Sequence, residues 1–428
     1  MPFPDASVRR LRDVPWEALR GLAPALEGAL AEVLGGGAAE RVLDRLLRSR
    51  PDLDAHGRRA VAEAVFGVGL WRRRLRLHAG PDAPPLALLA SLVGDLAGRE
   101  GARGLCAAGG PERPPAPPPA ALADHYSLPD WLAAILEREA GAEAAPLADA
   151  LGCPGPVFLR ANRARGDREA LARRLAAEGL ATRPGRLAPD ALELLTPRPN
   201  LLVRAAWREG LVEVQDEASQ LAGELVAAGP GDEVLDLCAG AGGKALQLAA
   251  AGARVHACDP DGERLARLRA RASRAGASGA LTVHGASPPP ELRVDRALVD
   301  APCSGLGALR RGPDLRHRLD PAGFARLPAL QLSLLAAAAG HVRPGGRLVY
   351  ATCTLRREEN EEVALAFERA HPGFARAPAG PPEVATPEGF LRTWPHRHGT
   401  DGFFAAAWVR EAGAGRGAAS GVSRGTGA

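Results

Sequence analysis

Residues Glu233–Lys244 read EVLDLCAGAGGK and hold the strongest fold signal in this chain of 428 residues. Apolar residues typical of a buried parallel strand pass into a glycine-rich turn, and a helix is expected to follow from Ala245 to Ala250. Backbone amides can approach a ligand closely in such a turn. The pattern predicts an α/β fold of the Rossmann-like type, with a nucleoside site at the end of this strand.

The next predicted strand, Arg254–Cys258, supports the nucleoside site because it ends in Asp259. This carboxylate lies roughly 20 residues beyond the glycine turn, the usual distance for binding ribose hydroxyls. The turn lacks a full dinucleotide fingerprint, so these residues alone leave NAD and S-adenosylmethionine equally open. Lys244 is the only lysine among 54 lysine and arginine residues, which indicates that this position requires a compact ammonium rather than the planar arginine fork.

Two cysteine-centred motifs follow apolar runs further along the chain. They are DAPCSG, Asp300–Gly305, after Ala297–Val299, and YATCT, Tyr350–Thr354, which begins at the end of a second run. Open α/β sheets place their chemistry at the carboxyl ends of such strands. Two thiols, Cys303 and Cys353, facing one crevice indicate covalent catalysis.

Five motifs, taken in order, resemble those of the Sun-type (Fmu-like) RNA cytosine-5 methyltransferases, which are relatives of the nucleolar Nop2 proteins. The resemblance runs from about Tyr126 to Arg410. It implies a class I methyltransferase domain, S-adenosylmethionine as the cofactor and RNA as the substrate. The motifs are Val214–Ser219; Leu237–Lys244; Asp300–Gly305 with Arg310, Arg311, Pro313 and Asp314 behind it; Tyr350–Thr354 with Glu358–Asn360 behind it; and Asp401–Phe404.

The chemistry of cytosine explains why such an enzyme would carry two thiols. Carbon 5 is a poor nucleophile, so an enzyme first adds a thiolate to carbon 6 and forms an enamine that can attack a methyl sulfonium. The proton on carbon 5 must then leave and the enzyme–base bond must break, which calls for a second acid/base group. The resemblance implies that Cys353 is the nucleophile, that Cys303 assists product release, and that Asp300 binds ring nitrogen 3 and the amino edge of the cytosine.

Two alternatives stay open for these residues. In DNA cytosine methyltransferases the nucleophile follows the proline, at the position where Cys303 stands, so the two thiols could have the opposite roles. Asp300 could instead serve as a helix cap at the end of its strand.

The resemblance also implies which residues bind the cofactor, and the chain departs from the family pattern at one of these places. After the third predicted strand, Ala280–Val283, family members carry Gly-Asp, whose carboxylate receives the adenine amino group, whereas this chain has Gly285 and Ala286. The site is therefore expected to lack that contact. The residues expected to bind S-adenosylmethionine are Cys238, Ala239, Gly240, Ala241, Gly242, Gly243, Lys244, Asp259 and Asp300.

Proline and glycine divide the chain into units. Apolar residues recur at helical spacing from Val42 to Val68, which predicts a helical bundle. This bundle resembles the NusB-like RNA-binding domain found in front of many Sun-type enzymes. A proline-rich stretch follows it, and the last residues have almost no apolar bulk. The expected units are a NusB-like all-α domain at 1–106, a linker at 107–124, a small α+β RNA-binding subdomain at 125–210, the methyltransferase domain at 211–411 and a disordered tail at 412–428.

A net charge of +4 is too small to establish nucleic-acid binding, but the arginines are clustered. Phosphate contacts from such clusters supply sequence-independent affinity. The first cluster is Arg72, Arg73, Arg74 and Arg76, and the second is Arg310, Arg311, Arg316 and Arg318. The residues expected to contact RNA are Arg310, Arg311 and, in the small subdomain, Arg160 and Asn162; the last two could equally be solvated residues at a strand end.

The composition, with 46% hydrophobic residues, predicts a soluble protein with a large core. The six cysteines lack metal-ligand spacing, and the chain shows neither an apolar leader nor a membrane-length apolar run. We expect reduced thiols, a cytoplasmic location, no metal, no membrane and a monomer.

The predicted function is methyl transfer from S-adenosylmethionine to carbon 5 of a cytosine in RNA, with small-subunit ribosomal RNA as the first candidate and transfer RNA as the alternative. Two further classes stay open. One is a catalytically inactive RNA-binding ribosome assembly factor, which the missing carboxylate at Ala286 favours. The other is a methyltransferase acting on DNA or on a small molecule.

Overall fold

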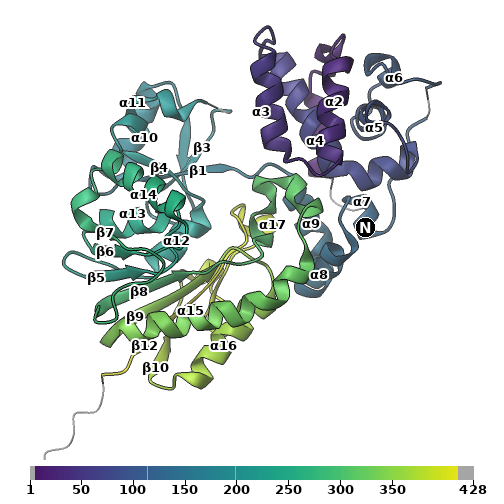
Figure 1. Cartoon of the computed structure of the whole chain (residues 1–428). Coiled ribbons are helices and arrows are strands. Elements are labelled where there is room, and N and C mark those ends of the chain that lie inside the picture. Colours follow the sequence, from purple (N-terminus) through teal and green to yellow (C-terminus); the bar gives the residue numbers. More distant parts are fainter. Residues whose placement is uncertain (1–4, 113, 198, 413–428) are drawn as a thin grey trace, which may run out of the picture.

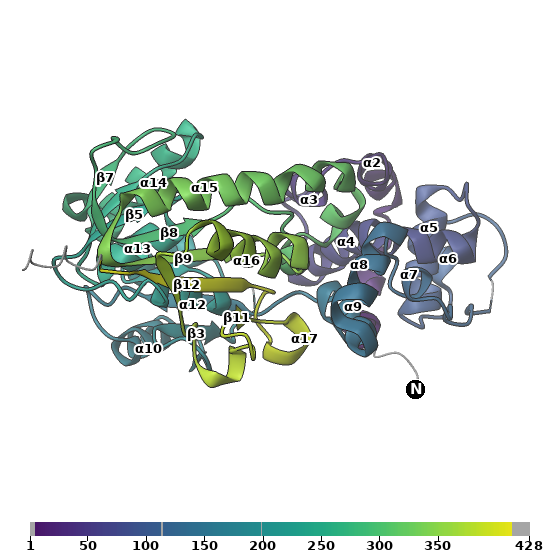
Figure 2. The ribbon, with the colours of Figure 1, turned by 90° about the horizontal axis from the view of Figure 1, so that it is seen from below.

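The computed structural model describes residues 5–112, 114–197 and 199–412, and Figures 1 and 2 show its ribbon in two perpendicular views. A helical region, a small antiparallel sheet and a large mixed sheet follow one another along the chain. The helical region, purple to blue, lies at one end of the molecule, and the large sheet lies at the other (Figure 1). The tail predicted at 412–428 falls outside the described residues, apart from Ala412.

The large sheet has the doubly wound topology of the predicted Rossmann-like fold. Its strand order is β10-β12-β9-β8-β5-β6-β7, and β11 pairs with β12. The strands from β7 to β9 run parallel, whereas β12 and β10 are antiparallel to their neighbours. The order reverses between β5 and β8, so a ligand crevice is expected at the carboxyl ends of these two strands. The bounds are β5 Glu233–Asp236, β6 Arg254–Ala257, β7 Leu281–Val283, β8 Val294–Asp300, β9 Val342–Thr352, β10 Phe374–Ala377, β11 Leu391–Arg392 and β12 Phe404–Arg410.

Helices cover both faces of the large sheet because neighbouring residues of a strand point to opposite sides. Val234, Leu298 and Val349 pack against α12, α13 and α14 on one face. Leu235 and Val299 pack against α15 and α16 on the other face, which lies toward the viewer in Figure 2. The bounds are α12 Glu217–Glu224, α13 Gly243–Ala250, α14 Gly262–Ala275, α15 Leu327–His341 and α16 Glu361–Ala370.

Helix α15 and the turn before it form one apolar segment, Pro321–His341, that is long enough to cross a membrane by length and composition. From the sequence we expect no apolar run of membrane length, but within the described residues this one segment is long and apolar enough. Buried residues make up 28% of its most apolar window, and α15 packs on the sheet through Leu335, Ala338 and Ala339. Core helices pass the same test of length and apolarity, so the segment by itself is weak evidence for a membrane.

The small sheet precedes the large one and consists of antiparallel pairs in the order β2-β3-β1-β4. Helix α10 packs on it through Leu171 and Leu175, which share a core with Leu159. The carboxylate of Asp167 accepts the N–H of Ala170 and caps this helix. The bounds are β1 Val157–Ala161, α10 Arg168–Ala177, β2 Thr182–Pro184, β3 Ala191–Leu194, α11 Ala205–Arg208 and β4 Val212–Val214.

The helical region has a core that continues into the segments behind the two cysteine motifs. Trp71 and Leu151 belong to this core, and so do Leu306, Leu309 and Leu355. Helices α8 and α9 therefore pack with the helical region, although the sequence assigns them to the unit at 125–210; the unit boundaries stay a prediction. The bounds are α1 Ala6–Arg9, α2 Ala23–Leu34, α3 Ala39–Ser49, α4 Ala55–Ala79, α5 Pro85–Ser91, α6 Ala102–Leu105, α7 Leu122–His125, α8 Asp130–Ala140 and α9 Ala144–Gly152.

Candidate active site

A cavity of about 860 Å³ lies at the carboxyl ends of β5, β6, β8 and β9. The crevice is the one that the sheet topology predicts, because parallel strands on both sides of the reversal end there. Among the residues proposed for the cofactor, all of which the structure describes, Gly242 alone does not line it. The predicted site residues that line it are Cys238, Ala239, Gly240, Ala241, Gly243, Lys244, Asp259, Asp300, Cys303 and Cys353.

The glycine turn owes its shape to two residues with left-handed backbone geometry. Gly240 has φ +53° and Gly242 has φ +88°, a region that side chains disfavour. A Cβ atom on Gly242 would also overlap the side chain of Leu268. Helix α13 begins directly after this turn, at Gly243 rather than at the predicted Ala245, so its first N–H groups lie beside the cavity.

Asp259 supports the glycine turn as well as lining the cavity. Its Oδ2 accepts the N–H of Gly240 at 3.0 Å, and its Oδ1 accepts the N–H of Asp261 at 2.9 Å. Each carboxylate oxygen can accept more than one hydrogen bond. Asp259 can therefore still accept a ligand hydroxyl, but its substitution would also loosen the turn.

Lys244 joins the glycine turn to the first cysteine motif. Its Nζ lies 2.6 Å from Asp300 Oδ2 and 5.1 Å from the ring centre of Phe403. The lysine side chain is buried, whereas the Asp300 side chain is 33% exposed. The ammonium thus holds the Asp300 carboxylate at the edge of the cavity, and Phe403 of the fifth motif packs over it.

Asp236 is a cavity residue that the sequence reasoning missed. It ends β5 and is buried, and neither of its carboxylate oxygens makes a well-formed hydrogen bond. Burial and the neighbouring Asp300 raise the pKa of Asp236 to about 7. A carboxylate at the end of an otherwise apolar strand is the signal that could have identified it, because an unpaired charge in such a place needs a ligand or a proton.

The two thiols of the cysteine motifs lie side by side. Cys303 Sγ is 3.5 Å from Cys353 Sγ, and both residues are half-buried. The hydrogen bond to Cys353 and burial raise the pKa of Cys303 well above its ordinary value. Cys303 therefore keeps its proton near neutral pH, and its thiol can donate hydrogen in this contact.

Glu359 clamps the two cysteine loops together from behind. It is fully buried and accepts the N–H of Ser304 at 2.9 Å and the hydroxyl of Ser304 at 2.6 Å. The Ser304 hydroxyl also contacts the Thr354 hydroxyl at 2.6 Å, and Gln331 donates to Glu359 at 3.0 Å. Because Ser304 follows Cys303 and Thr354 follows Cys353, this network fixes the two thiols relative to each other.

A chain of backbone contacts adds the fifth motif to the site. The N–H of Gly307 donates to the oxygen of Cys353 at 3.0 Å, and the N–H of Gly402 donates to the oxygen of Gly307 at 2.9 Å. A Cβ atom on Gly307 would overlap the backbone oxygen of Gly402. Only glycine therefore permits this close approach of three loops.

The four residues expected to contact RNA all have internal partners. Arg160 donates to the oxygen of Gly243 at 2.7 Å, and Asn162 donates to the oxygen of Gly210 at 2.8 Å. Arg310 and Arg311 pair with Asp401, and Arg311 also pairs with Asp216. These contacts favour a structural role, so RNA binding by the four stays a prediction that the geometry does not support. Within the described ranges, no group of three or more metal-ligating side chains is found.

Comparison with known proteins places the large sheet and the preceding part of the chain in one family. Residues 224–409 match the family model described as 16S rRNA methyltransferase RsmB/F. Residues 128–200 match the ferredoxin-like domain of RsmF/B-like methyltransferases.

Curated relatives agree with the family models over about two thirds of the chain. The Synechocystis sp. protein named "Probable ribosomal RNA small subunit methyltransferase B" is 37% identical over 301 residues, which is 67% of each chain. The ribosomal RNA small subunit methyltransferase B of Sodalis glossinidius is 35% identical, with 68% of this chain and 69% of that protein covered. The protein of the same name from Thermus thermophilus is 38% identical over 65% of this chain and 64% of its own.

Solved structures share the fold at lower sequence identity. The crystal structure of PH0851 matches with a TM-score of 0.73 and 23% identity, and the match covers 95% of this chain and 99% of that one. The crystal structure of NSun6 from Pyrococcus horikoshii with SFG matches with a TM-score of 0.59 and 21% identity, covering 66% of this chain and 98% of that one. The first match extends the shared fold to the helical region. The family models and the curated relatives show that the chain belongs to the RsmB/F family of 16S rRNA methyltransferases.

Proposed function

We propose that this protein transfers the methyl group of S-adenosylmethionine to carbon 5 of a cytosine in small-subunit ribosomal RNA, through a covalent bond between Cys353 and carbon 6. The observation that carries the proposal is the pair of thiols, 3.5 Å apart, on a cavity that the glycine turn also lines. Membership of the family supports ribosomal RNA as the substrate. The related NSun6 structure contains SFG, an analogue of S-adenosylmethionine, which supports this cofactor.

The residues of the cavity fit the proposed cofactor. The buried oxygens of Asp236, which make no well-formed hydrogen bond, suit a ligand that carries a positive ammonium group. The N–H groups of the turn from Cys238 to Lys244 and the carboxylate of Asp259 would hold the rest of the molecule, with Asp259 accepting ribose hydroxyls. When bound, S-adenosylmethionine supplies an electrophilic methyl group on a sulfonium.

The pair of Asp300 and Lys244 suits the activation of cytosine. The Asp300 carboxylate can accept a hydrogen bond from the exocyclic amino group, and the Lys244 ammonium has N–H groups beyond the one that Asp300 takes. Hydrogen bonding at ring nitrogen 3 stabilises the electron pair that moves there when the Cys353 thiolate adds to carbon 6. When that pair re-forms the double bond between nitrogen 3 and carbon 4, the carbon 4–carbon 5 electron pair can form the new bond to the methyl group, and the methyl–sulfonium bond would break with its electrons staying on the sulfur of S-adenosylmethionine.

The protonated thiol of Cys303 suits the release step. After methyl transfer, a base removes the proton from carbon 5, the carbon 5–carbon 6 double bond re-forms, and the bond between Cys353 and carbon 6 breaks with its electron pair returning to sulfur. Cys303 lies within contact distance of that sulfur. It can therefore stabilise the departing thiolate by donating its hydrogen.

The test is transfer of a labelled methyl group from S-adenosylmethionine to protein-free small-subunit ribosomal RNA, followed by digestion to nucleosides. We expect the label in 5-methylcytidine. Label in any other nucleoside would contradict the cytosine chemistry. Transfer to transfer RNA but not to ribosomal RNA would favour the alternative substrate, and cofactor binding without any transfer would favour an inactive assembly factor.

A further inference from the structure

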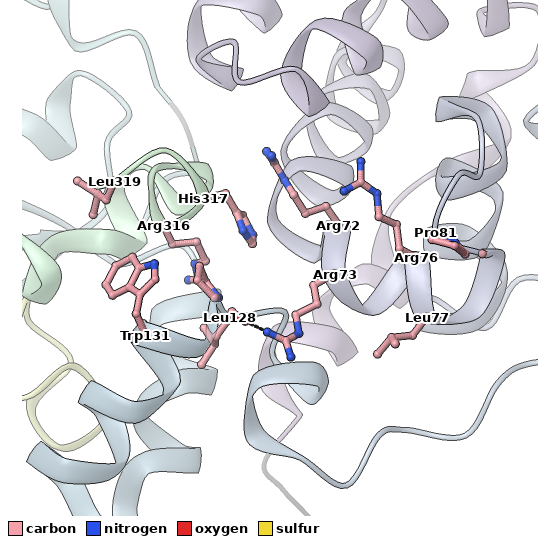
Figure 3. Close-up of a pocket in the computed structure, with 12 residues that line it drawn as sticks. Arg72, Arg73, Arg76, Leu77, Pro81, Leu128, Trp131, Arg316, His317 and Leu319 are labelled. Atoms are coloured by element: carbon pink, nitrogen blue, oxygen red, sulfur yellow. Dashed lines mark hydrogen bonds between the residues drawn. The ribbon is translucent and has the colours of Figure 1, made fainter. Parts of the chain in front are cut away.

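A second cavity, of about 670 Å³, lies between the helical region and the segment behind the first cysteine motif (Figure 3). Its volume falls within the roughly 300–1,000 Å³ typical of ligand sites. Three parts of the chain form it: the end of α4, the start of α8, and η8 (Pro313–His317) with the residues that follow. Figure 3 shows Arg72, Arg73 and Arg76 on one side, with Trp131 and Leu319 on the opposite side.

The cationic side of this cavity carries more positive charge than its neighbours neutralise. Four arginines line it, and no aspartate or glutamate is among the described lining residues. Arg73 is neutralised by Asp124 and Asp130, each at 2.6 Å. Arg72 binds only backbone oxygens, those of Gly69 and Val33. Neither Arg72 nor the exposed Arg76 forms an ion pair with any residue of the described ranges.

Arg316 adds an unusual buried charge at the same place. It is 1% exposed, and its Nη2 donates to the oxygen of Leu151 at 2.7 Å, while its Nε and Nη1 have no partner among the described residues. Burial lowers the pKa of Arg316 to about 10. A buried guanidinium with unused donors costs free energy unless an anion compensates it.

The opposite side of the cavity offers apolar and aromatic surface. Trp131 is half-buried and packs edge-to-face on Phe324 at 5.7 Å, and Leu319 lies on the same side of the cavity (Figure 3). His317 lies between the two sides (Figure 3). Burial and the nearby Arg72 lower the pKa of His317 to about 3, so the ring is neutral. Because its Nε2 donates to the oxygen of Leu70, its Nδ1 is left as a hydrogen-bond acceptor.

We propose that this cavity binds an unpaired nucleotide of the RNA substrate, with the phosphate on Arg72 and Arg76 and the base against Trp131. Unpaired arginines facing an aromatic surface match a nucleotide, because single-stranded nucleic acid is bound by phosphate contacts together with stacking. The neutral His317 can accept a hydrogen bond from a ribose 2′-hydroxyl, a group that DNA lacks. The proposal rests on the proposed function only in taking RNA as the substrate.

The position of the cavity gives this binding a purpose. Arg316 lies on the segment between β8 and α15, which also carries Cys303. His317, the proposed ribose contact, lies on the same segment, so the bound nucleotide would connect this segment to the helical region that carries Arg72 and Arg76. RNA held at this second place would fix which cytosine can reach the thiols, since the target base must be turned out of its strand.

The test compares two double variants that remove the same number of charges from the same helix. Arg72→Ala/Arg76→Ala removes the cavity charges, and Arg58→Ala/Arg59→Ala removes two exposed arginines outside the cavity. Binding of a short fluorescein-labelled single-stranded RNA is measured by anisotropy at several salt concentrations. We expect the cavity variant to bind roughly ten- to a hundredfold more weakly, with a salt slope smaller by about 1, and the control to bind like the wild type.

Trp131→Ala gives an independent measurement of the aromatic side. Loss of one stacked base is expected to weaken binding roughly five- to a hundredfold without changing the salt slope. RNA containing 4-thiouridine should cross-link to peptides containing residues 128–131 or 316–319, and the cross-link should disappear in Arg72→Ala/Arg76→Ala. Equal weakening in the two double variants would reduce the effect to bulk charge and overturn the proposal, and so would cross-links that avoid both peptides.

Kinetics separate this proposal from the function on which it rests. Arg72→Ala/Arg76→Ala should raise KM for ribosomal RNA and leave kcat at saturating RNA near the wild-type value. A fall in kcat alone would mean that the arginines only support the catalytic segment, which contradicts the proposal. If the wild type binds RNA but methylates no cytosine, the proposed function fails. The binding and cross-linking results would then still show whether the cavity binds a nucleotide of the RNA.

Discussion

Lys244 Nζ lies 2.6 Å from Asp300 Oδ2, so the single lysine of the chain is paired with the aspartate of the first cysteine motif. The pair connects two loops that follow different strands, β5 and β8. Asp300 stands near another carboxylate, Asp236, whose pKa it raises. The ammonium is therefore the counter-charge for a carboxylate group that would otherwise repel its neighbour.

Removal of that counter-charge should weaken both stability and the cofactor site. We expect Lys244→Met to lower the free energy of unfolding by ~1 to 3 kcal/mol, less than the ~3 to 5 kcal/mol typical of breaking a fully buried pair, because water screens the partly exposed Asp300. The double variant Lys244→Met/Asp300→Asn should recover part of the loss. Denaturant titrations of the four proteins in the cycle measure the coupling, and strictly additive losses would show that the pair contributes nothing.

The two thiols should behave differently when each is removed. Cys353→Ala should abolish methyl transfer and leave no covalent species, because the proposed nucleophile is gone. Cys303→Ala should still form the bond to carbon 6 but release it slowly, so a denaturant-resistant adduct with RNA should accumulate. Denaturing gels measure both, and wild-type enzyme with RNA containing 5-fluorocytosine is the positive control, since fluorine cannot leave as a proton does. An adduct from Cys353→Ala and none from Cys303→Ala would exchange the two roles.

The buried Asp236 predicts a pH dependence with a defined sign. Its pKa is raised to about 7, above the ordinary value of ~3.9, so between these values the folded protein holds a proton that the unfolded chain has released. The stability contributed by this group is therefore full below about pH 4 and is lost as pH rises toward 7. Denaturant titrations should show Asp236→Asn gaining stability over the wild type as pH rises through this window. A difference in free energy of unfolding between the two proteins that is constant with pH would contradict the raised pKa of Asp236.

Cofactor binding should follow the opposite trend through the same carboxylate. A positively charged ligand favours the ionised form of Asp236, so the affinity of the wild type for S-adenosylmethionine should increase as pH rises through about 7. Calorimetry on both sides of this pH measures the trend. Asp236→Asn should bind S-adenosylmethionine more weakly and show no such increase. An equally steep increase in the variant would mean that another group causes the pH dependence.

A substitution at Ala286 is expected to increase the affinity for S-adenosylmethionine rather than decrease it. This residue lines the cofactor cavity at the position where relatives are expected to carry an aspartate. Ala286→Asp should tighten S-adenosylmethionine binding by about tenfold, as expected for a new hydrogen bond to a charged acceptor. The exposed neighbour Ser287, changed to aspartate, controls for added charge. Calorimetry showing no gain at position 286 would mean that the adenine amino group already has another acceptor.

Glu359 should act on chemistry and stability but not on the cofactor. Glu359→Gln keeps the shape of the side chain and weakens its contacts with Ser304 and Gln331, which should cost ~1 to 3 kcal/mol of stability and lower kcat. The neighbouring change Glu358→Gln, at a partly exposed position, is the control. Melting curves, kcat and the affinity for S-adenosylmethionine are compared for both variants. A normal kcat in Glu359→Gln would show that the contacts of Glu359 do not contribute to catalysis.

The fold and the position of the cavity could be predicted from the sequence because their signals are local. Glu233–Lys244 shows a strand, a turn and a helix start within one stretch, and both cysteines stand directly after apolar runs. Parallel strands then bring Cys303 and Cys353 to the same edge without further information. The distance of 3.5 Å between the thiols could not be predicted, because it depends on Glu359, whose partners lie far away in the sequence.

The partners of the arginines could not be predicted for the same reason. Arg160 and Arg310 look like solvent-facing cations in the sequence, but they bind Gly243 and Asp401, which lie in distant parts of the chain. Asp236 looks like one residue of an apolar strand, and only its burial without a well-formed hydrogen bond reveals its importance. Charge in a sequence indicates how many cations exist, whereas tertiary packing decides which of them remain free.

The core that joins Leu306, Leu309 and Leu355 to the helical region has a consequence for how this protein could be rearranged by evolution or by engineering. A chain cut before the small sheet would leave these three leucines facing water, directly behind the two cysteine loops. Burying a leucine stabilises a fold by roughly 1.5 to 3 kcal/mol, so the exposed catalytic half would lose much of its margin against unfolding. The helical region therefore cannot be replaced freely by another domain. A replacement domain must provide an apolar surface that covers the same three leucine side chains.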